Sequence, residues 1–522
     1  MKFTDEQMGM IAAKGKVVIG NAFSGTGKTA TLVGFAEANH KSKILCCVLN
    51  KSVAVEAQQR FPSNVKTLTS HALAFGNIGK NYKHKLGQPR PFQVAKAFKL
   101  PFGNEQHKVM ISALALEALR QFMTLPDMTI NEKHVSLAEC KRMGFSVGEV
   151  INLANAIWSE MIDPDSAFPI PHDGYLKLYQ LSQPRLPYDI IQLDESQDLN
   201  PVTLDIMSKQ THAQEILVGD SHQNIYGFRN SVNALDVIEA DEYHYLTQSW
   251  RFGPQVAEVA NRILAVFKDE TRLLKGFGAE GSITGIDDSK AHTILCRTNA
   301  GIFDAAVGAL DAHGDIKLTF AGGIQGYALD QLEDTWRLMK GKKSDIRDPY
   351  VKSFNSYDEM QVYAEDIDDK ELKARIRVCE KYKDAVPVKL REIRSKAQDD
   401  SRQSLVTLST SHKSKGLEWD QVKLWSDFPD MVSDKGIPLT SRNVMRMNDS
   451  DMDQLDIEEA NLLYVSVTRA RKALDAEGSS VERFLKSRLT QLDRVRGSLI
   501  GASKDPLMDE VTKTVDLSFL NV

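Results

Sequence analysis

The sequence predicts an α/β fold built on a parallel sheet, because short apolar runs repeatedly lead through a loop into a helical pattern. The first run, 17–19, precedes a glycine-rich loop and then an apolar helical pattern that includes Phe35. Further strand-like apolar runs are 44–49, 65–68 and 190–193. The carboxyl ends of parallel strands share one edge of a sheet, and we expect the functional loops there.

The loop after the first run, residues 22–29, reads AFSGTGKT and matches the phosphate-binding pattern G-x-x-x-x-G-K-[ST] except at Ala22, which is small enough to leave the turn possible. Glycines let backbone N–H groups turn inward around phosphates, and the next helix adds partial positive charge. We expect Lys28 to reach the β- and γ-phosphates and Thr29 to bind Mg²⁺. A chance match is the alternative, which the flanking strand and helix disfavour. The loop residues predicted to hold the nucleotide are Ala22, Ser24, Gly25, Thr26, Gly27, Lys28 and Thr29.

Two carboxylates follow the apolar run 190–193, on Asp194 and Glu195. A strand that ends in such a pair is what a nucleotide hydrolase needs opposite its phosphate loop. Asp194 can complete the Mg²⁺ shell, and Glu195 can accept a proton from the attacking water. A second apolar run, 216–218, ends at Gly219-Asp220 and is followed by Gln223.

Composition and charge limit the possible classes of protein. The chain has 522 residues, enough for about three or four domains. Its net charge is −5, so nucleic-acid binding requires a local basic groove. Residues 57–104 contain no Asp or Glu and interleave basic residues with aromatic ones. Such a run suits a phosphate backbone with stacked bases, or it forms a solvated basic face, and the sequence leaves both interpretations open.

Cysteine usage and hydropathy predict an intracellular location. The five cysteines form no C-x-x-C pair, and adjacent Cys46 and Cys47 lie in an apolar run. This pattern indicates reduced core cysteines in a reducing compartment. There is no apolar stretch of membrane-spanning length and no signal peptide at the N-terminus. We therefore expect a cytoplasmic protein that does not engage a membrane.

Six motifs in order resemble those of the UvrD/Rep-type superfamily 1 DNA helicases. They are AFSGTGKT (22–29), LDESQD (193–198), GDSHQNIYGFR (219–229), LTQSWRF (246–252), SHKSKGLEWD (411–420) and EEANLLYVSVTRAR (458–471). Two more stretches, 49–62 and 172–181, are similar to the helicase part of the F-box DNA helicase branch. One such match would be weak, but six at family-like spacing are specific.

The resemblance implies two RecA-like motor domains, each a doubly wound parallel sheet with a mainly helical insertion. The implied parts are 1–75 with 185–247 (first motor domain, ATP-binding), 76–184 (its helical insertion), 248–325 with 402–500 (second motor domain), 326–401 (its short insertion) and 501–522 (C-terminal tail).

The resemblance also assigns roles to side chains at the matching positions. Gln7 and Trp250 would hold the adenine, Trp250 by stacking, and Glu418 would contact the ribose. The residues implied in hydrolysis are Glu195, Gln223 as γ-phosphate sensor, Arg251 and Arg469. The arginines would stabilise transition-state charge, which is worth about 10³–10⁵ in rate in related systems.

A further set is implied in DNA binding. Tyr226 and Phe228 would stack on bases, a contact worth about 1–3 kcal/mol each. Asn50, His71 and His412 would lie along the strand path. A lone histidine is often a structural residue, so this alternative stays open for His71.

The function implied is that of an ATP- and Mg²⁺-dependent DNA helicase or translocase. It would move 3′ to 5′ on single-stranded or tailed duplex DNA, in repair, recombination or replication. One alternative is a translocase that strips bound proteins such as recombinase filaments, with a recombinase or a replication protein as partner. Another is a DNA-gated ATPase scaffold in a repair or defence complex. No residue excludes RNA as the strand.

Overall fold

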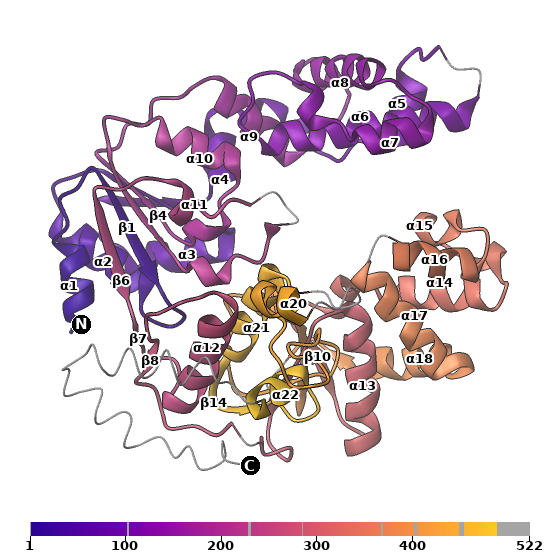
Figure 1. Cartoon of the computed structure of the whole chain (residues 1–522). Coiled ribbons are helices and arrows are strands. Elements are labelled where there is room, and N and C mark those ends of the chain that lie inside the picture. The colour runs from indigo at the N-terminus through magenta and orange to yellow at the C-terminus, as the bar shows by residue number, and fades with distance from the viewer. Residues whose placement is uncertain are drawn as a thin grey trace. The chain divides into compact units, whose positions relative to one another are not determined.

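The computed structural model describes residues 2–101, 104–227, 231–283, 285–366, 369–400, 404–447 and 454–487 (Figure 1). The chain divides into two compact units. The first comprises Met1–Ala22 and Gly27–Leu246, and the second comprises Phe23–Thr26 and the chain from Thr247 onward. The finer domain boundaries given above stay predictions.

The first unit contains a six-stranded sheet with the order β3-β2-β4-β5-β1-β6. Every pairing in it is parallel, which confirms the predicted class of fold. The strands are β1 (Val17–Ala22), β2 (Ile44–Cys47), β3 (Val65–Leu68), β4 (Ile190–Leu193), β5 (Gln214–Gly219) and β6 (Glu242–Leu246). The second strand ends at Cys47, earlier than the apolar run suggests, because the next residues lead into the following helix.

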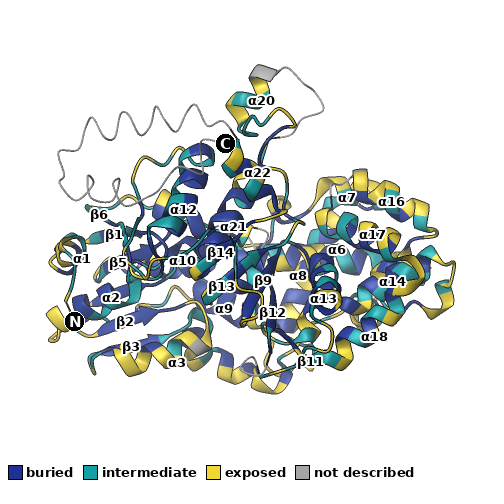
Figure 2. Ribbon diagram, turned by 90° about the horizontal axis from the view of Figure 1, so that it is seen from below, coloured by how far each residue is buried: buried dark blue, intermediate teal, exposed yellow. Residues whose placement is uncertain are grey.

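Alternate residues of these strands enter two different cores, as the two-residue period of a strand requires. On one face, Val18 and Ile216 pack with Leu32 and Phe35 of α2 (Lys28–Ala38). On the other face, their chain neighbours, such as Leu217, pack against the helices that follow β3. Figure 2 shows the buried strands in dark blue between partly exposed helices. On the α2 face lie also α1 (Asp5–Ile11) and α3 (Lys51–Arg60), and on the opposite face lie α10 (Pro201–Ser208) and α11 (Ala234–Val237).

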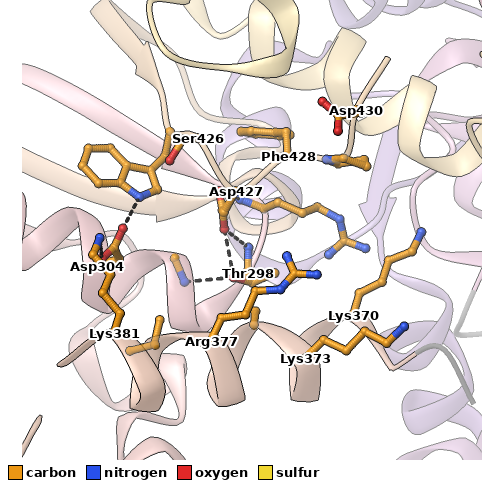
Figure 3. Close-up of a pocket in the computed structure, with 16 residues that line it drawn as sticks. Thr298, Asp304, Lys370, Lys373, Arg377, Lys381, Ser426, Asp427, Phe428 and Asp430 are labelled. Carbon is orange, nitrogen blue, oxygen red and sulfur yellow. Dashed lines mark hydrogen bonds and ion pairs between the residues drawn. The ribbon is translucent and has the colours of Figure 1, made fainter. Parts of the chain in front are cut away.

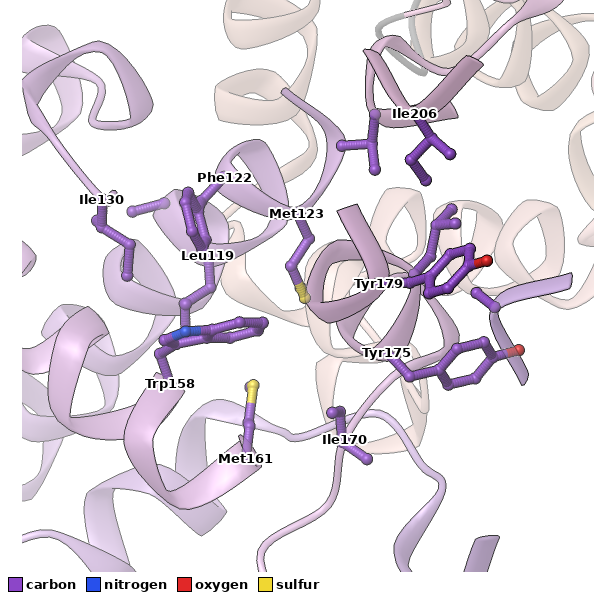
Figure 4. Packing of buried hydrophobic residues seen from close by; sticks show 14 of the residues in the cluster. Leu119, Phe122, Met123, Ile130, Trp158, Met161, Ile170, Tyr175, Tyr179 and Ile206 are labelled. Carbon is purple, nitrogen blue, oxygen red and sulfur yellow. The ribbon is translucent and has the colours of Figure 1, made fainter. Parts of the chain in front are cut away.

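A helical segment separates β3 from β4, and its apolar side chains interlock in one large cluster (Figure 4). Its α-helices are α4 (Ser70–Asn77), α5 (Pro91–Ala97), α6 (Glu105–Thr124), α7 (Leu137–Met143), α8 (Val147–Ile162) and α9 (His172–Leu181). Part of the predicted basic and aromatic run is structural. Tyr82 is buried and donates to the carbonyl of Ile162, and the Lys85 ammonium donates to three carbonyl oxygens.

The second unit contains another six-stranded sheet, with the order β11-β10-β12-β9-β13-β14 and only parallel pairings among the described strands. Its strands are β9 (His292–Cys296), β10 (Leu318–Phe320), β11 (Ala397–Gln398), β12 (Val406–Thr410), β13 (Trp419–Leu424) and β14 (Ala470–Asp475). Neighbouring residues of β9 again enter different cores, Leu295 on one face and Ile294 on the other.

Helices cover both faces of this second sheet. Those outside the insertion are α12 (Pro254–Phe267), α13 (Asn299–His313), α19 (Ser411–Ser414), α20 (Ser441–Met447), α21 (Ile457–Val467) and α22 (Ser480–Lys486). Between β10 and β11 lie α14 (Leu329–Met339), α15 (Pro349–Ser353), α16 (Tyr357–Asp366), α17 (Lys370–Tyr382) and α18 (Val386–Lys396). A small parallel pair joins β7 (Gln248–Ser249) to β8 (Lys275–Gly276).

All five cysteines are buried free thiols, as predicted. Burial raises the pKa of Cys46 well above its ordinary value, so this thiol stays protonated and unreactive. Within the part of the chain that the structure describes, no helix is long and apolar enough to cross a membrane.

A buried ammonium ties α9 to the end of α6. Lys177 is fully buried over the ring of Phe122, with 4.3 Å from Nζ to the ring centroid. Its Nζ donates to the carbonyls of Leu125, at 2.7 Å, and Asp127. Burial lowers the pKa of Lys177 to about 8.

Lys177→Met should therefore destabilise the helical segment by roughly 1–3 kcal/mol, because it leaves buried carbonyls without a donor. The expected readout is a lower thermal midpoint together with faster hydrogen exchange in α6 and α9. The matched control is Lys141→Met on α7, where the side chain is exposed. Equal midpoints for the two variants would contradict the structural role of Lys177.

Candidate active site

The phosphate-loop sequence joins β1 to α2, as the motif predicts. Gly27 is the N-cap of α2 with φ 82°, and Gly25 has φ 76°, both in the left-handed region that favours glycine. A Cβ at Gly27 would lie 2.8 Å from the side-chain nitrogen of Gln7. Both glycines are therefore required by backbone conformation, and Gly27 also by the close approach of Gln7.

Four predicted side chains of the first unit meet at the ends of β1 and β4. Thr29 Oγ1 donates to Asp194 Oδ2 at 3.1 Å, and Lys28 Nζ lies 3.8 Å from Glu195 Oε1. Burial, and secondarily the Glu195 charge, raise the pKa of Asp194 to about 6, while Lys28 and the Thr29 hydroxyl oppose the shift. A buried carboxylate of this kind is stabilised as an anion by a nearby cation.

These residues fit the predicted Mg²⁺ site. Magnesium in nucleotide enzymes uses one or two protein carboxylates together with phosphates and water. Asp194 and Thr29 supply a buried carboxylate and a hydroxyl in contact with each other. No cluster of three or more His, Cys, Asp or Glu that would hold a metal by itself occurs among the described residues. The side chains present thus suit a cation that arrives with its phosphates.

Glu195 has a left-handed backbone, with φ 53° and ψ 44°. For a residue other than glycine this costs roughly 1–2 kcal/mol, and such strain clusters at functional sites. The turn places the Glu195 carboxylate between Lys28 Nζ and Gln197 Nε2, which donates to Glu195 Oε2 at 2.6 Å.

Gln197 is a functional candidate that the sequence analysis missed. It is fully buried, and its Oε1 accepts from the backbone N–H of Asp220 at 3.0 Å. Its carbonyl accepts from the Asn224 amide at 2.6 Å. The predicted sensor Gln223 is buried in the same turn and donates to Asp220 Oδ2 at 2.7 Å. Gln197 therefore links the end of β4 to the end of β5. Its place within LDESQD was the available signal.

Gln7 combines a helix cap with a position at the phosphate loop. Its Oε1 accepts from the N–H of Thr4 at 2.9 Å, and its own N–H donates to Thr4 Oγ1 at 3.2 Å. This reciprocal pair starts α1. The side-chain nitrogen is the atom near Gly27. The capping role that the structure shows for Gln7 is thus compatible with the predicted nucleotide contact.

Three residues predicted for DNA binding line one cavity of about 590 Å³ in the first unit. They are Asn50, His71 and Tyr226, and Asp194 and Glu195 line the same cavity. The residues predicted for strand binding and the carboxylates predicted for hydrolysis therefore share one concave surface.

His71 and Asn50 both have local structural partners. His71 Nε2 lies 2.9 Å from Asp173 Oδ1, with both side chains partly exposed. Asn50 caps α3 by accepting from the Val53 N–H at 2.9 Å. Phe228 lies outside the residues that the structure describes. His412 lies half-buried in α19 of the second unit.

The two predicted arginines converge on Ser24, which belongs to the second unit. Arg251 Nη1 and Arg469 Nη2 donate to Ser24 Oγ at 2.8 and 3.2 Å. Arg251 Nε also donates to Glu418 Oε2 at 2.6 Å. Arg469 is 1% exposed and is fixed by the carbonyls of Val465 and Leu417.

The apolar run YVSV (464–467) of the sixth motif suggests a strand that leads into a helix, but the structure has the reverse order. The run forms the end of α21, and Arg469 lies in the turn before β14. Strand and helix cannot be distinguished from a short buried apolar run alone, because both of its faces are apolar. The helical turn lets the Arg469 Nε donate to the Val465 carbonyl at 2.9 Å.

Trp250 is 55% exposed and forms an open aromatic surface with Phe277. The ring centroids lie 5.4 Å apart at 39°. The Trp250 N–H donates to the carbonyl of Gly25 at 3.0 Å, which ties the aromatic residue to the loop. Phe277 was not predicted, because it lies outside every motif.

Two protein families match the chain. An AAA domain matches residues 6–229, and the UvrD-like helicase C-terminal domain matches residues 328–475. F-box DNA helicase 1 of Gallus gallus is 35% identical, and the alignment covers 91% of this chain and 49% of that protein. F-box DNA helicase protein 1 of Schizosaccharomyces pombe is 29% identical, covering 88% of this chain and 55% of that protein. The chain spans about half the length of these relatives.

Among solved structures, the PRRSV helicase aligns over 90% of this chain and 53% of its own, at 11% identity. The TM-score of 0.29 is too low for that likeness to support any conclusion.

Gln197→Ala should lower the turnover of nucleoside triphosphate about 10- to 100-fold with little change in KM, because it frees the Glu195 carboxylate from its fixed position. Steady-state kinetics separate the two constants. Gln210→Ala is the matched control, because Gln210 is also buried and bonded but contacts neither carboxylate. If both variants are less stable than wild type but keep the wild-type turnover, the role of Gln197 is structural.

Proposed function

We propose that this chain, which belongs to the UvrD-like superfamily 1 DNA helicases, is an ATP-dependent helicase or translocase that moves on single-stranded DNA. The observation that carries the proposal is the cavity of the first unit, where Asp194 and Glu195 adjoin Asn50, His71 and Tyr226. Nucleotide hydrolysis and strand binding would then use one continuous surface.

The residues of the phosphate loop and of the segment after β4 have separate roles. Lys28 binds the β- and γ-phosphates, and Glu195 accepts the proton of the attacking water. Thr29 and Asp194 would hold Mg²⁺, which neutralises phosphate charge when bound. Gln197 keeps the Glu195 carboxylate oriented through its 2.6 Å hydrogen bond. Arg251 and Arg469 stabilise the charge that develops on the γ-phosphate.

The turn after β5 would couple ATP hydrolysis to DNA binding. The hydrogen bonds Glu195–Gln197, Gln197–Asp220 and Asp220–Gln223 form a continuous chain that is buried except at Glu195. Tyr226, a proposed stacking residue, follows Gln223 closely in that segment. A change in the phosphates sensed by Gln223 would therefore reach the strand contact. The 3′-to-5′ direction rests on the family resemblance.

Protein stripping is a second candidate function, favoured by the similarity to the F-box DNA helicases. A translocase of this kind would clear a recombinase filament without much strand separation. Unwinding of tailed duplexes, with and without a bound recombinase, separates the two functions. ATPase assays with single-stranded DNA, duplex DNA and RNA identify the strand that is used.

Lys28→Ala should abolish ATP hydrolysis and weaken ATP binding, because it removes the cation that contacts the β- and γ-phosphates. Lys41→Ala, an exposed lysine of the same unit, serves as the control and should behave as wild type. A Lys28 variant that unwinds tailed duplexes at the wild-type rate would mean that the phosphate loop is assigned wrongly.

Glu195→Gln should retain ATP binding and hold single-stranded DNA while turnover and unwinding disappear. The amide keeps the size and hydrogen bonding of the side chain but cannot act as the base. Nucleotide and DNA binding are measured beside steady-state turnover. Turnover within a few-fold of wild type would assign water activation to another residue, and lost ATP binding would assign Glu195 to the metal shell or the core.

A further inference from the structure

The second unit contains a cavity of about 550 Å³ that none of the predicted nucleotide or DNA residues lines. It lies among α17, the start of α13 and the chain after β13, as Figure 3 shows. Its charged lining is mainly cationic: Arg297, Lys370, Lys373, Arg377 and Lys381, against Asp304, Asp427 and Asp430.

One face of α17 supplies most of these cations. Lys370, Lys373, Arg377 and Lys381 are spaced three or four residues apart, which puts them on a single stripe of a helix. The opposite face is buried through residues such as Leu372 and Cys379. Figure 3 shows the Lys370, Lys373 and Arg377 side chains reaching from the helix into the cavity.

The lining carboxylates already have other partners. Asp427 accepts from the N–H groups of Arg297 and Thr298 and from the Thr298 hydroxyl, each at 2.8 Å. Asp304 accepts from the Trp425 indole at 3.1 Å and from the Tyr382 hydroxyl at 2.7 Å, and it forms an ion pair with Lys381 at 2.6 Å. Asp304 therefore neutralises Lys381, whereas no ion pair joins the lining acids to Lys373 or Arg377 among the described residues.

The cations that line the cavity differ in how fully they are paired. The buried Glu459 carboxylate is shared by Arg297, at 2.7 Å, and Lys370, at 3.0 Å, and the charges of Glu371 and Asp427 also act on Arg297. Lys373, whose side chain is 16% exposed, pairs with Glu365, whose side chain is 72% exposed. Solvent and salt screen the exposed Glu365 carboxylate, so another anion can take its place beside Lys373.

Arg377 completes the cationic surface. It is exposed, and among the described residues no carboxylate lies within ion-pair distance of it. A guanidinium offers planar paired donors that match phosphate oxygens, and Arg is weakly hydrated compared with Lys.

We propose that this cavity binds phosphate groups, and that their source is the backbone of a nucleic-acid strand held by the second unit. This inference rests on the proposed function and adds a contact that the six motifs do not contain. A free polyphosphate has the same chemistry and is the alternative source. Arg377 and Lys373 make the phosphate contacts, while Arg297 and Lys370 form the fixed wall around Glu459.

The test titrates the full chain with a fluorescent oligothymidylate at several salt concentrations. The double variant Arg377→Ala, Lys373→Ala should weaken binding about tenfold and lower the slope of log K against log salt by about 1–2, because two phosphate contacts are lost. DNA-free ATPase should stay unchanged. Arg377→Lys should recover most of the slope, because it keeps the charge.

Arg391→Ala is the matched control, because Arg391 is an exposed arginine of the same insertion that does not line the cavity. If the double variant and Arg391→Ala bind oligothymidylate with the same affinity and salt slope, and also bind tripolyphosphate equally well, the phosphate site is refuted. A parallel titration with tripolyphosphate distinguishes the sources. If only tripolyphosphate binding depends on Arg377, the nucleic-acid source is wrong.

The same titrations separate this inference from the proposed function. A wild-type chain that binds no oligothymidylate refutes the proposed function. If it nevertheless binds tripolyphosphate, and the double variant does not, the cavity remains a phosphate site. Melting temperatures equal to wild type establish that the variants are folded.

Discussion

The first unit depends on keeping one carboxylate, that of Asp194, buried at the end of a central strand. Only 5% of this residue is exposed, and burial alone would favour its protonated form. The ionised form of Asp194 is stabilised by Thr29 and Lys28, which follow strand β1. Thr29 lies 165 residues away from Asp194 in the sequence. The strand order β4-β5-β1 brings the two strand ends to the same edge. The sheet topology is thus what makes this electrostatic arrangement possible.

At the same edge of the sheet, the buried side-chain amide of Gln197 connects the carboxylate of Glu195 to the turn that follows β5. Gln197 lies between the Glu195 carboxylate and the Asp220 backbone, and a Cβ on Gly219 would approach Gln197 Oε1 to 2.4 Å. Packing of this kind leaves the amide little alternative orientation. A buried polar network that is fully bonded is rigid, so a displacement at one end is transmitted to the other.

In the second unit, buried carboxylates hold the fold together and are not among the residues predicted for hydrolysis. There, acids such as Asp427 and Glu459 fix backbone N–H groups and an arginine within the fold. The cations of α17 are then left facing a cavity, although the chain as a whole carries a net charge of −5. In a protein of net negative charge, most of the surface repels anions. Anions are therefore expected to bind where cations gather on one helix face.

The sequence by itself determined the parallel sheets, the phosphate loop and the pair of carboxylates after β4. These features depend on local patterns: apolar runs buried on two faces, and a glycine loop whose backbone permits one conformation. Tertiary structure decided the rest. Strand β6, with exposed and half-buried residues, has no apolar run, and the run before Arg469 is equally compatible with a helix or a strand. Gln197, Phe277 and the cationic stripe of α17 acquire their partners only through contacts between distant segments, which no local pattern of residues specifies.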